Sequence, residues 1–171
     1  MHTMKKIVCL GGGSGGTSTL LRGLKNYPAH ITSVSSMADD GGSSGRLRKA
    51  YDIMPPGNLI SCIAALVPDT HADLVGLLMH RFPGSSRENK ALGGHKVGNL
   101  IMLAELQRTG DFYQAIETTK RLFGVTNADI FPATDEQTHL SATTRDGRRI
   151  FTETTLDVGA YAKPHELKKI H

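Results

Sequence analysis

The sequence predicts an α/β fold with a doubly wound, mainly parallel sheet and a β-hairpin near the C-terminus. Two observations carry this prediction. Residues 7–10 form an apolar, strand-like run that leads through a cluster of glycines into a helical pattern, and residues 31–34 form a β-branched run that leads into another polar loop. Strands joined by a helix are parallel, so both loops are expected at the carboxyl edge of one sheet, where open α/β folds bind ligands.

The spacing of apolar residues predicts the helices in order. A helical period is present at residues 17–25, 58–67, 69–81, 96–108 and 111–123. Asn58, Asp69 and Asp111 stand at the starts of three of these segments and are expected to act as N-caps. The segment at 96–108 is apolar on nearly all sides, which predicts a buried helix. Residues 83–94 are polar and are expected to form a loop.

The pattern changes after residue 126. Residues 130–132 are typical of a strand, and residues 140–144 and 149–153 flank Asp146-Gly147, a strong hairpin-turn signal. We therefore divide the chain into an α/β domain at 1–126 and a strand and hairpin appendage at 127–171.

Composition excludes several classes of protein. The chain has 171 residues, with 20 Lys and Arg against 16 Asp and Glu, which gives a formal net charge of +4 and favours phosphates or other polyanions as partners. There is no Trp, and the few Tyr and Phe do not alternate with basic residues, which argues against a nucleic-acid partner. No apolar run approaches the roughly 20 residues of a membrane span, and no secretory pattern opens the chain, so we expect a cytoplasmic protein with no membrane partner. Cys9 and Cys62 lack close partners and are expected as reduced core thiols.

The first glycine cluster predicts a phosphate-binding turn. It satisfies G-x-G-x-x-G between a strand and a helix, as in nucleotide-binding folds, and bare backbone with free N–H groups at a helix start favours an anion. The alternative is a tight strand-to-helix corner without a ligand. Thr17 stands where a P-loop has lysine, which excludes an ATPase or kinase of that class. The predicted binding residues are Gly11, Gly12, Gly13, Ser14, Gly15, Gly16 and Thr17.

The second loop combines carboxylates, hydroxyls and a guanidinium. Asp39 lies 23 residues after Gly16, where nucleotide-binding folds place the acidic residue that binds ribose. A second interpretation is magnesium held by Asp39 and Asp40 beside a phosphate bound by Arg46. The structural alternative is an Asp-rich turn with a solvated arginine. The candidate residues of this loop are Asp39, Asp40, Gly41, Gly42, Ser43, Ser44 and Arg46.

Residues 93–99 open the expected buried helix and form a third candidate segment. His95 and Asn99 are four residues apart, so they share a helix face near its start and could both meet a ligand. A lone histidine is also commonly a cap or a satisfied core residue, and the sequence leaves both readings open.

Four motifs follow one another along the first hundred residues. They are GGGSGGTSTLLRGLK at 11–25, ADDGGSSGRLR at 38–48, PPG at 55–57 and GHKVGNL at 94–100. Together they resemble the bacterial gluconeogenesis factor family, which is related to 2-phospho-L-lactate transferase (CofD-like); weaker similarity continues through PATDE at 132–136 and the hairpin.

The resemblance implies a Rossmann-like fold that binds nucleotide sugars, especially uridine diphosphate sugars, with the two glycine loops contacting the nucleotide and its phosphates. It also implies a role in growth on gluconeogenic carbon and in cell shape and wall synthesis. The transferase relatives use a guanosine diphosphate-linked donor with magnesium.

Two differences from the family pattern limit which family properties can be transferred to this chain. After Pro-Pro-Gly the family usually has Asp-Ile-Arg-Asn, whereas this chain has Asn58, Leu59, Ile60 and Ser61, and the lost carboxylate and arginine should weaken charge-dependent binding. The family chain is nearly twice as long, and its later glycine-serine phosphate loop is absent here. We therefore expect an exposed sheet edge or apolar face that a second chain covers, and hence a homo-oligomer.

Three functions remain open on the sequence. The first is a nucleotide-sugar-binding regulatory protein of the gluconeogenesis factor type. The alternative is a magnesium-dependent phosphotransferase that uses a nucleotide diphosphate-linked donor, although no sequence feature indicates an acceptor site. The third is a degenerate scaffold that only mediates interactions.

Overall fold

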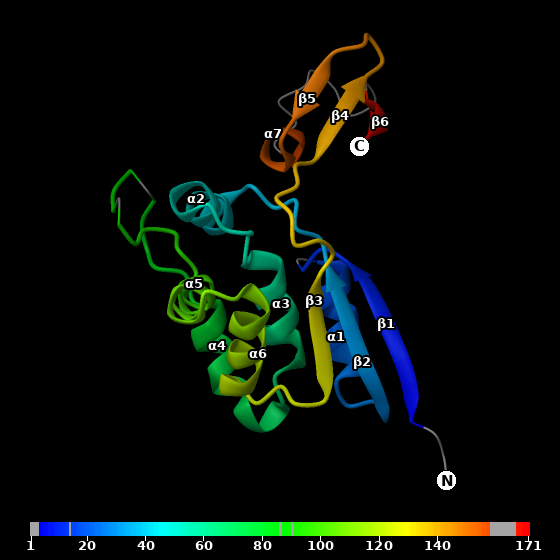
Figure 1. The fold of residues 1–171 in the computed structure, drawn as a ribbon, viewed down its shortest axis with the longest axis vertical. Helices are drawn as coiled ribbons and strands as arrows, with labels where there is room; N and C mark the ends of the chain where they lie inside the picture. Colours follow the sequence, from blue (N-terminus) through cyan, green and yellow to red (C-terminus); the bar gives the residue numbers. More distant parts are fainter. Residues whose placement is uncertain (1–3, 14, 86, 90, 158–166) are drawn as a thin grey trace.

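A parallel sheet of three strands is the centre of the structure. The computed structural model describes residues 4–13, 15–85, 87–89, 91–157 and 167–171 (Figure 1). The strands are β1 (Lys5–Gly11), β2 (Ala29–Ser35) and β3 (Ala128–Pro132), hydrogen-bonded in the order β1-β2-β3. Gly11 pairs with Ser35, and Ser35 pairs with Pro132, so all three strands end at one edge. The mixed α/β class with a parallel sheet is thereby confirmed.

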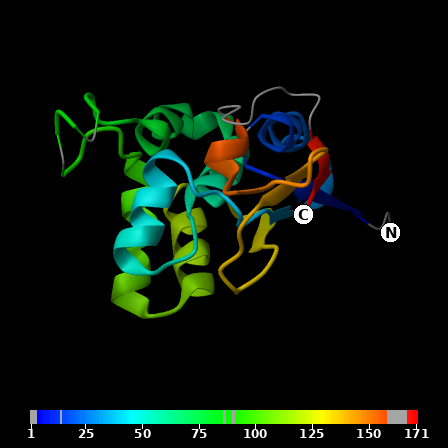
Figure 2. The ribbon, with the colours of Figure 1, turned by 90° about the horizontal axis from the view of Figure 1, so that it is seen from above.

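Helices pack against one face of this sheet in two layers (Figures 1 and 2). The first layer is α1 (Gly16–Leu24) and α3 (Gly57–Leu66), which contact each other and the strands. The second layer is α4 (Ala72–Met79), α5 (Val97–Thr109) and α6 (Phe112–Leu122), which contact α3. All ten residues of α3 are buried, because a helix that is apolar around its circumference is stable only with neighbours on every side.

The opposite face of the sheet carries exposed apolar side chains. Alternate residues of a strand point to opposite faces. In β1, Cys9 faces the core, whereas Val8 is 62% exposed and Leu10 is 75% exposed. Leu10 is in register with Val34, and Val34 with Phe131, which is 42% exposed. An apolar row thus crosses three strands on the face away from α1 and α3.

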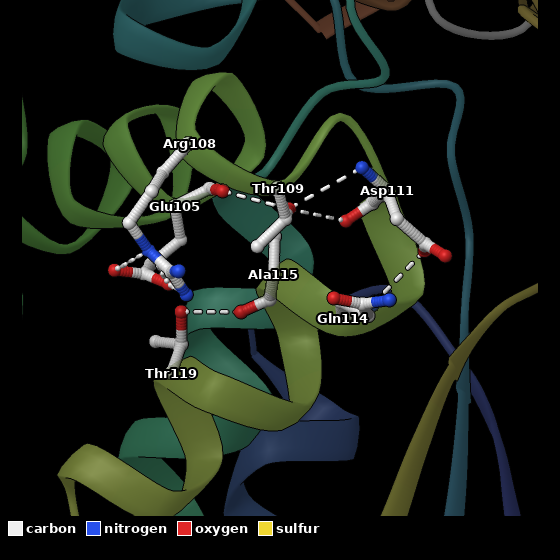
Figure 3. A network of polar contacts seen from close by, with 7 residues as sticks. All are labelled: Glu105, Arg108, Thr109, Asp111, Gln114, Ala115 and Thr119. Atoms are coloured by element: carbon white, nitrogen blue, oxygen red, sulfur yellow. Dashed lines mark hydrogen bonds and ion pairs between the residues drawn. The ribbon is translucent and has the colours of Figure 1, made fainter.

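The turn between α5 and α6 follows the capping prediction (Figure 3). Gly110 ends α5 in the left-handed conformation, with φ of 70°. Asp111 then caps α6, and its side chain accepts a hydrogen bond from the backbone N–H of Gln114 at 3.0 Å. The hydroxyl of Thr109 donates to the carbonyl of Glu105 at 2.8 Å, which closes the last turn of α5.

Two other capping predictions are wrong. Pro56 is the N-cap of α3, and the Asn58 side chain instead donates from Nδ2 to the carbonyl of Ser36 at 2.9 Å. Asp69 lies in a 3-10 turn, η1 (Asp69–His71), and its carboxylate binds Lys25 at 2.6 Å. In both cases a partner distant in sequence competes with the local cap.

Two further segments differ from the expected pattern. The helix α2 (Gly42–Tyr51) begins inside the stretch that was expected to be a loop. Helix α5 is less buried than its apolar sequence suggests, with Gly98, Asn99, Met102 and Leu103 as its buried residues. Cys9 and Cys62 are free and buried, as expected of core thiols.

A second, antiparallel sheet lies near the C-terminus. Strands β4 (Ser141–Thr144) and β5 (Arg149–Phe151) form the predicted hairpin, whose turn residue Gly147 has φ of 87°. The short helix α7 (Glu153–Asp157) follows, and β6 (Leu167–Ile170) adds to β4, giving the order β5-β4-β6. No sequence pattern predicted β6. Strand β3 belongs to the main sheet, although the division at residue 126 grouped it with the hairpin.

In the part of the chain that the structure describes, no single helix is long and apolar enough to cross a membrane. One pair, Gly57–Leu66 with Asp69–Met79, has the required length and composition but is bent by 114°.

Candidate functional site

The first glycine turn leaves the end of β1 and packs tightly on α3. A Cβ atom at Gly13 would lie 2.0 Å from the carbonyl oxygen of Asn58, so only glycine allows the two backbones to come this close. Gly15 is the N-cap of α1 with φ of 74°, and no side chain caps the helix start, which leaves its first N–H groups available to an anion. Gly13 therefore serves packing, while Gly15 and the start of α1 suit a phosphate. Ser14 lies outside the described residues.

The two carboxylates of the second loop point to different places. Asp39 Oδ1 accepts a hydrogen bond from the backbone N–H of Gly41 at 3.0 Å. Asp40 instead binds the start of α7: its carboxylate accepts from the N–H of Glu153 at 3.1 Å, the N–H of Thr154 at 2.8 Å and the Thr154 hydroxyl at 2.6 Å. Burial works to raise the pKa of Asp40, but these hydrogen bonds and the charge of Arg48 hold it below its ordinary value.

The first turn of α2 is tied to the start of α5 by buried polar groups. The Ser43 hydroxyl oxygen accepts from the backbone N–H of Lys96 at 3.2 Å and from Nδ2 of Asn99 at 3.0 Å, and it lies 3.0 Å from Nδ1 of His95. Since that oxygen already accepts twice, its one hydrogen is directed to His95 Nδ1, which leaves the ring proton on Nε2. Burial, followed by the charges of Arg46 and Arg81, lowers the pKa of His95, so the ring is neutral at pH 7.

Arg46 has a structural partner. Its Nη2 donates to the carbonyl of Gly93 at 2.7 Å, and a Cβ at Gly94 would lie 3.5 Å from that nitrogen. Arg46 therefore holds the 93–94 segment against α2. The expected phosphate clamp at this position remains a prediction.

The two glycine loops open on adjacent cavities. One cavity of about 580 Å³ contains Gly13 and Gly15 in its wall, and one of about 340 Å³ is lined by Asp39 and the start of α2. Both cavities share Ser61, Arg81 and Lys96.

The predicted residues divide between these walls. The smaller cavity gathers Asp39, Gly41, Gly42, Ser43, Ser44 and Asn99. Asp40 lines a third cavity of about 550 Å³ beside α2, with Arg48 and Lys49. Gly11, Gly12, Gly16, Thr17, Arg46 and His95 are not part of the walls of the first two cavities.

Sequence reasoning missed the residues at the junction. Lys96 is only 8% exposed, and its Nζ lies 3.4 Å from the hydroxyl of Ser61. Burial, followed by the charge of Arg81, lowers the pKa of Lys96, and the nearby Asp39 opposes this effect. Arg81 forms a backbone bridge with Lys96 and donates from Nη1 to the carbonyl of Gly94 at 2.8 Å. The one available signal was a lysine at the start of an apolar helix.

The described residues contain no group of three His, Cys, Asp or Glu side chains placed to hold a metal ion. Magnesium is commonly held by one or two carboxylates together with substrate phosphates. Because Asp39 faces the smaller cavity and Asp40 does not, Asp39 is the carboxylate that fits this role, and the metal prediction for the pair stays a prediction.

Comparison with known proteins extends over nearly the whole chain. The family model for 2-phospho-L-lactate transferase CofD matches residues 7–170. A relative from Bacillus subtilis (strain 168), named gluconeogenesis factor, is 41% identical over 91% of this chain and 47% of its own length. A gluconeogenesis factor from Halalkalibacterium halodurans is 38% identical over 89% of this chain and 45% of its own.

A solved structure agrees with these matches. A crystal structure of a Bacillus halodurans protein superposes with a TM-score of 0.84 at 35% identity and covers 98% of this chain and 50% of that one. A second crystal structure of the same protein describes it as a member of the UPF0052 family. This chain thus spans about half the length of these relatives.

Proposed function

The chain belongs to the 2-phospho-L-lactate transferase CofD family, and from that premise we propose that it is a gluconeogenesis factor that binds a nucleotide sugar. Uridine diphosphate sugars are the ligands that we expect. In this proposal the bound sugar nucleotide signals the carbon state of the cell and links growth on gluconeogenic carbon to cell shape and wall synthesis. The relatives from Bacillus subtilis and Halalkalibacterium halodurans are named gluconeogenesis factors, which supports this assignment for the chain.

The observation that carries the proposal is the junction of the two cavities. Gly13 and Gly15 line one cavity, Asp39 lines the other, and the cations Arg81 and Lys96 stand between them. A diphosphate suits such a place, because backbone N–H groups, the buried Lys96 and the exposed Arg81 stabilise its charge together. The cavities on either side offer room for the groups attached to each phosphate.

The test is a titration with uridine diphosphate glucose in which binding is monitored by thermal unfolding of the protein. Ligand at 100 times its Kd should stabilise the folded protein by about 2.7 kcal/mol. For a chain of this size that corresponds to a rise in Tm of roughly 5–10 °C. A mixture of uridine and glucose, which lacks the diphosphate, is the control and should leave Tm unchanged. No shift with millimolar sugar nucleotide would refute the proposal.

The phosphotransferase alternative is less favoured by the geometry. It requires magnesium beside the donor, and the two candidate carboxylates diverge, since Asp40 is occupied by the N–H groups of Glu153 and Thr154. Incubation of a nucleotide diphosphate-linked donor with magnesium and candidate acceptors separates the two functions. Nucleotide release that depends on Asp39 would favour the transferase.

We also propose that the chain forms a homo-oligomer through the bare face of its main sheet. The support is the row of Leu10, Val34 and Phe131, which continues across all three strands with Leu10 75% exposed. Exposed apolar residues are normally scattered singly, and a contiguous row on a flat face is typical of an interface. A second copy offers the same apolar row and so matches it.

A further inference from the structure

Lys96 is a buried lysine that forms no ion pair among the described residues, although the Asp39 carboxylate lines the same cavity. Its side chain is 8% exposed, and among the described residues its ammonium has one hydrogen-bond partner, the Ser61 hydroxyl at 3.4 Å. The ion pairs of the described chain involve other lysines, at Lys25 and Lys120. Burying an ammonium group without a close counter-charge is costly, and this cost is offset when an anion binds beside it.

Asn99 gives a second, independent sign of a ligand. Asn99 is 1% exposed and lines the smaller cavity, and its Nδ2 donates to the hydroxyls of Ser43 and Ser44 at 3.0 and 3.3 Å. Its Oδ1 is buried and has no hydrogen-bond partner among the described residues. Buried polar atoms are nearly always satisfied, so this oxygen calls for a donor such as a hydroxyl group.

The two cavities differ in character. The larger one has an apolar floor that includes Ala64, Ala65, Val75 and Met79. The smaller one is walled mainly by polar groups, among them Asp39 and Asn99. A flat, partly apolar nucleobase fits the larger cavity, and a polyhydroxylated sugar ring fits the smaller one.

We propose that Lys96 and Arg81 neutralise a diphosphate at the junction of the two cavities, with the nucleoside in the larger cavity and the sugar in the smaller one, where Asn99 Oδ1 accepts a hydrogen bond from a sugar hydroxyl. The placement of base and sugar rests on the proposed nucleotide-sugar binding. The anion site at Lys96 does not, because it follows from the burial of this ammonium group where the two cavities meet. The orphan oxygen of Asn99 supports the sugar contact only.

Isothermal titration with inorganic pyrophosphate tests the anion site without any nucleoside. Lys96→Met removes the charge while keeping the volume of the side chain, and we expect the affinity for pyrophosphate to fall at least tenfold. Lys96→Arg should retain most of the affinity. Lys169→Met, at an exposed position of β6, changes the net charge equally and should bind as the wild type does. Thermal unfolding of the ligand-free variant is a second measurement. Lys96→Met should keep or raise the Tm, because it replaces a buried ammonium group that has no ion-pair partner by an apolar group.

The outcomes separate the inference from the proposed function. Equal pyrophosphate affinity in Lys96→Met and wild type overturns the anion site. Lys96-dependent pyrophosphate binding without any binding of uridine diphosphate glucose supports the anion site and overturns the nucleotide-sugar function. For the sugar contact, Asn99→Ala should weaken uridine diphosphate glucose more than uridine diphosphate; an equal loss for both ligands overturns the role of Asn99.

Discussion

A single methyl group at Gly13 tests how the glycine turn is held. In Gly13→Ala the new Cβ would lie 2.0, 2.3 and 2.4 Å from the carbonyl oxygen, Cα and carbonyl carbon of Asn58, whereas ordinary contact begins near 3.4 Å. All three are backbone atoms of the fully buried helix α3, so no side chain can rotate away. The turn must shift, which strains the bond from Asn58 to Ser36 at 2.9 Å. Overpacking of this kind costs about 1–3 kcal/mol, which for this chain length lowers Tm by roughly 2–12 °C.

Thermal unfolding followed by circular dichroism measures this loss. Gly16→Ala is the matched control, because nothing lies within 4 Å of its added Cβ and alanine favours the helix that begins there. We expect Gly16→Ala to keep or raise the Tm. A Tm of Gly13→Ala within 1 °C of the wild type, together with lost binding of sugar nucleotide, would contradict the packing role and assign Gly13 to the ligand alone.

Three further predictions concern other parts of the fold. Asp111→Ala removes the cap of Gln114 and should cost about 1 kcal/mol in urea unfolding, whereas Asp111→Asn should cost less; equal losses would contradict the capping role. Hydrogen bonds from Thr154 lower the pKa of Asp40, so the ionised carboxylate stabilises the fold at neutral pH and this stabilisation is lost as the pH falls through that pKa. The Tm difference between wild type and Asp40→Asn should therefore shrink below about pH 4. A Tm difference that stays constant with pH would refute this. Leu10→Asp should convert the homo-oligomer to monomer in sedimentation velocity, and a wild-type monomer would refute the interface.

The main elements of the fold follow from local patterns. The apolar period placed α1, α3, α4, α5 and α6, and the Asp-Gly turn placed the β4–β5 hairpin, to within a few residues. Helix α2 was missed entirely, because the glycine and serine residues at its start are weak helix formers. Its first turn is instead fixed by Ser43 and Ser44, which are buried against Asn99. Strand β6 depends on pairing with β4, more than twenty residues away, which no local pattern predicts.

The site was predictable only in part for the same reason. Parallel strands place the ends of β1 and β2 at one edge, and this rule brought the two glycine loops to neighbouring cavities. The cations between them could not be found from spacing. Arg81 follows α4 and Lys96 precedes α5, and they meet only because the intervening segment folds back so that their backbones bridge. The side chains at such a junction are set by tertiary packing.

The departure from the family pattern after Pro-Pro-Gly has a physical counterpart in this packing. Asn58 donates a hydrogen bond to the Ser36 carbonyl, which an aspartate carboxylate at this position could not do. Ile60 is fully buried, and a Cβ at Gly98 would lie 2.6 Å from its side chain, so this position is filled by an apolar group. The Lys96 ammonium stands beside Ser61 of the same turn. Positive charge therefore also reaches this turn from Lys96, the N-cap of α5. The weaker charge-dependent binding expected from the changes in α3 stays a prediction.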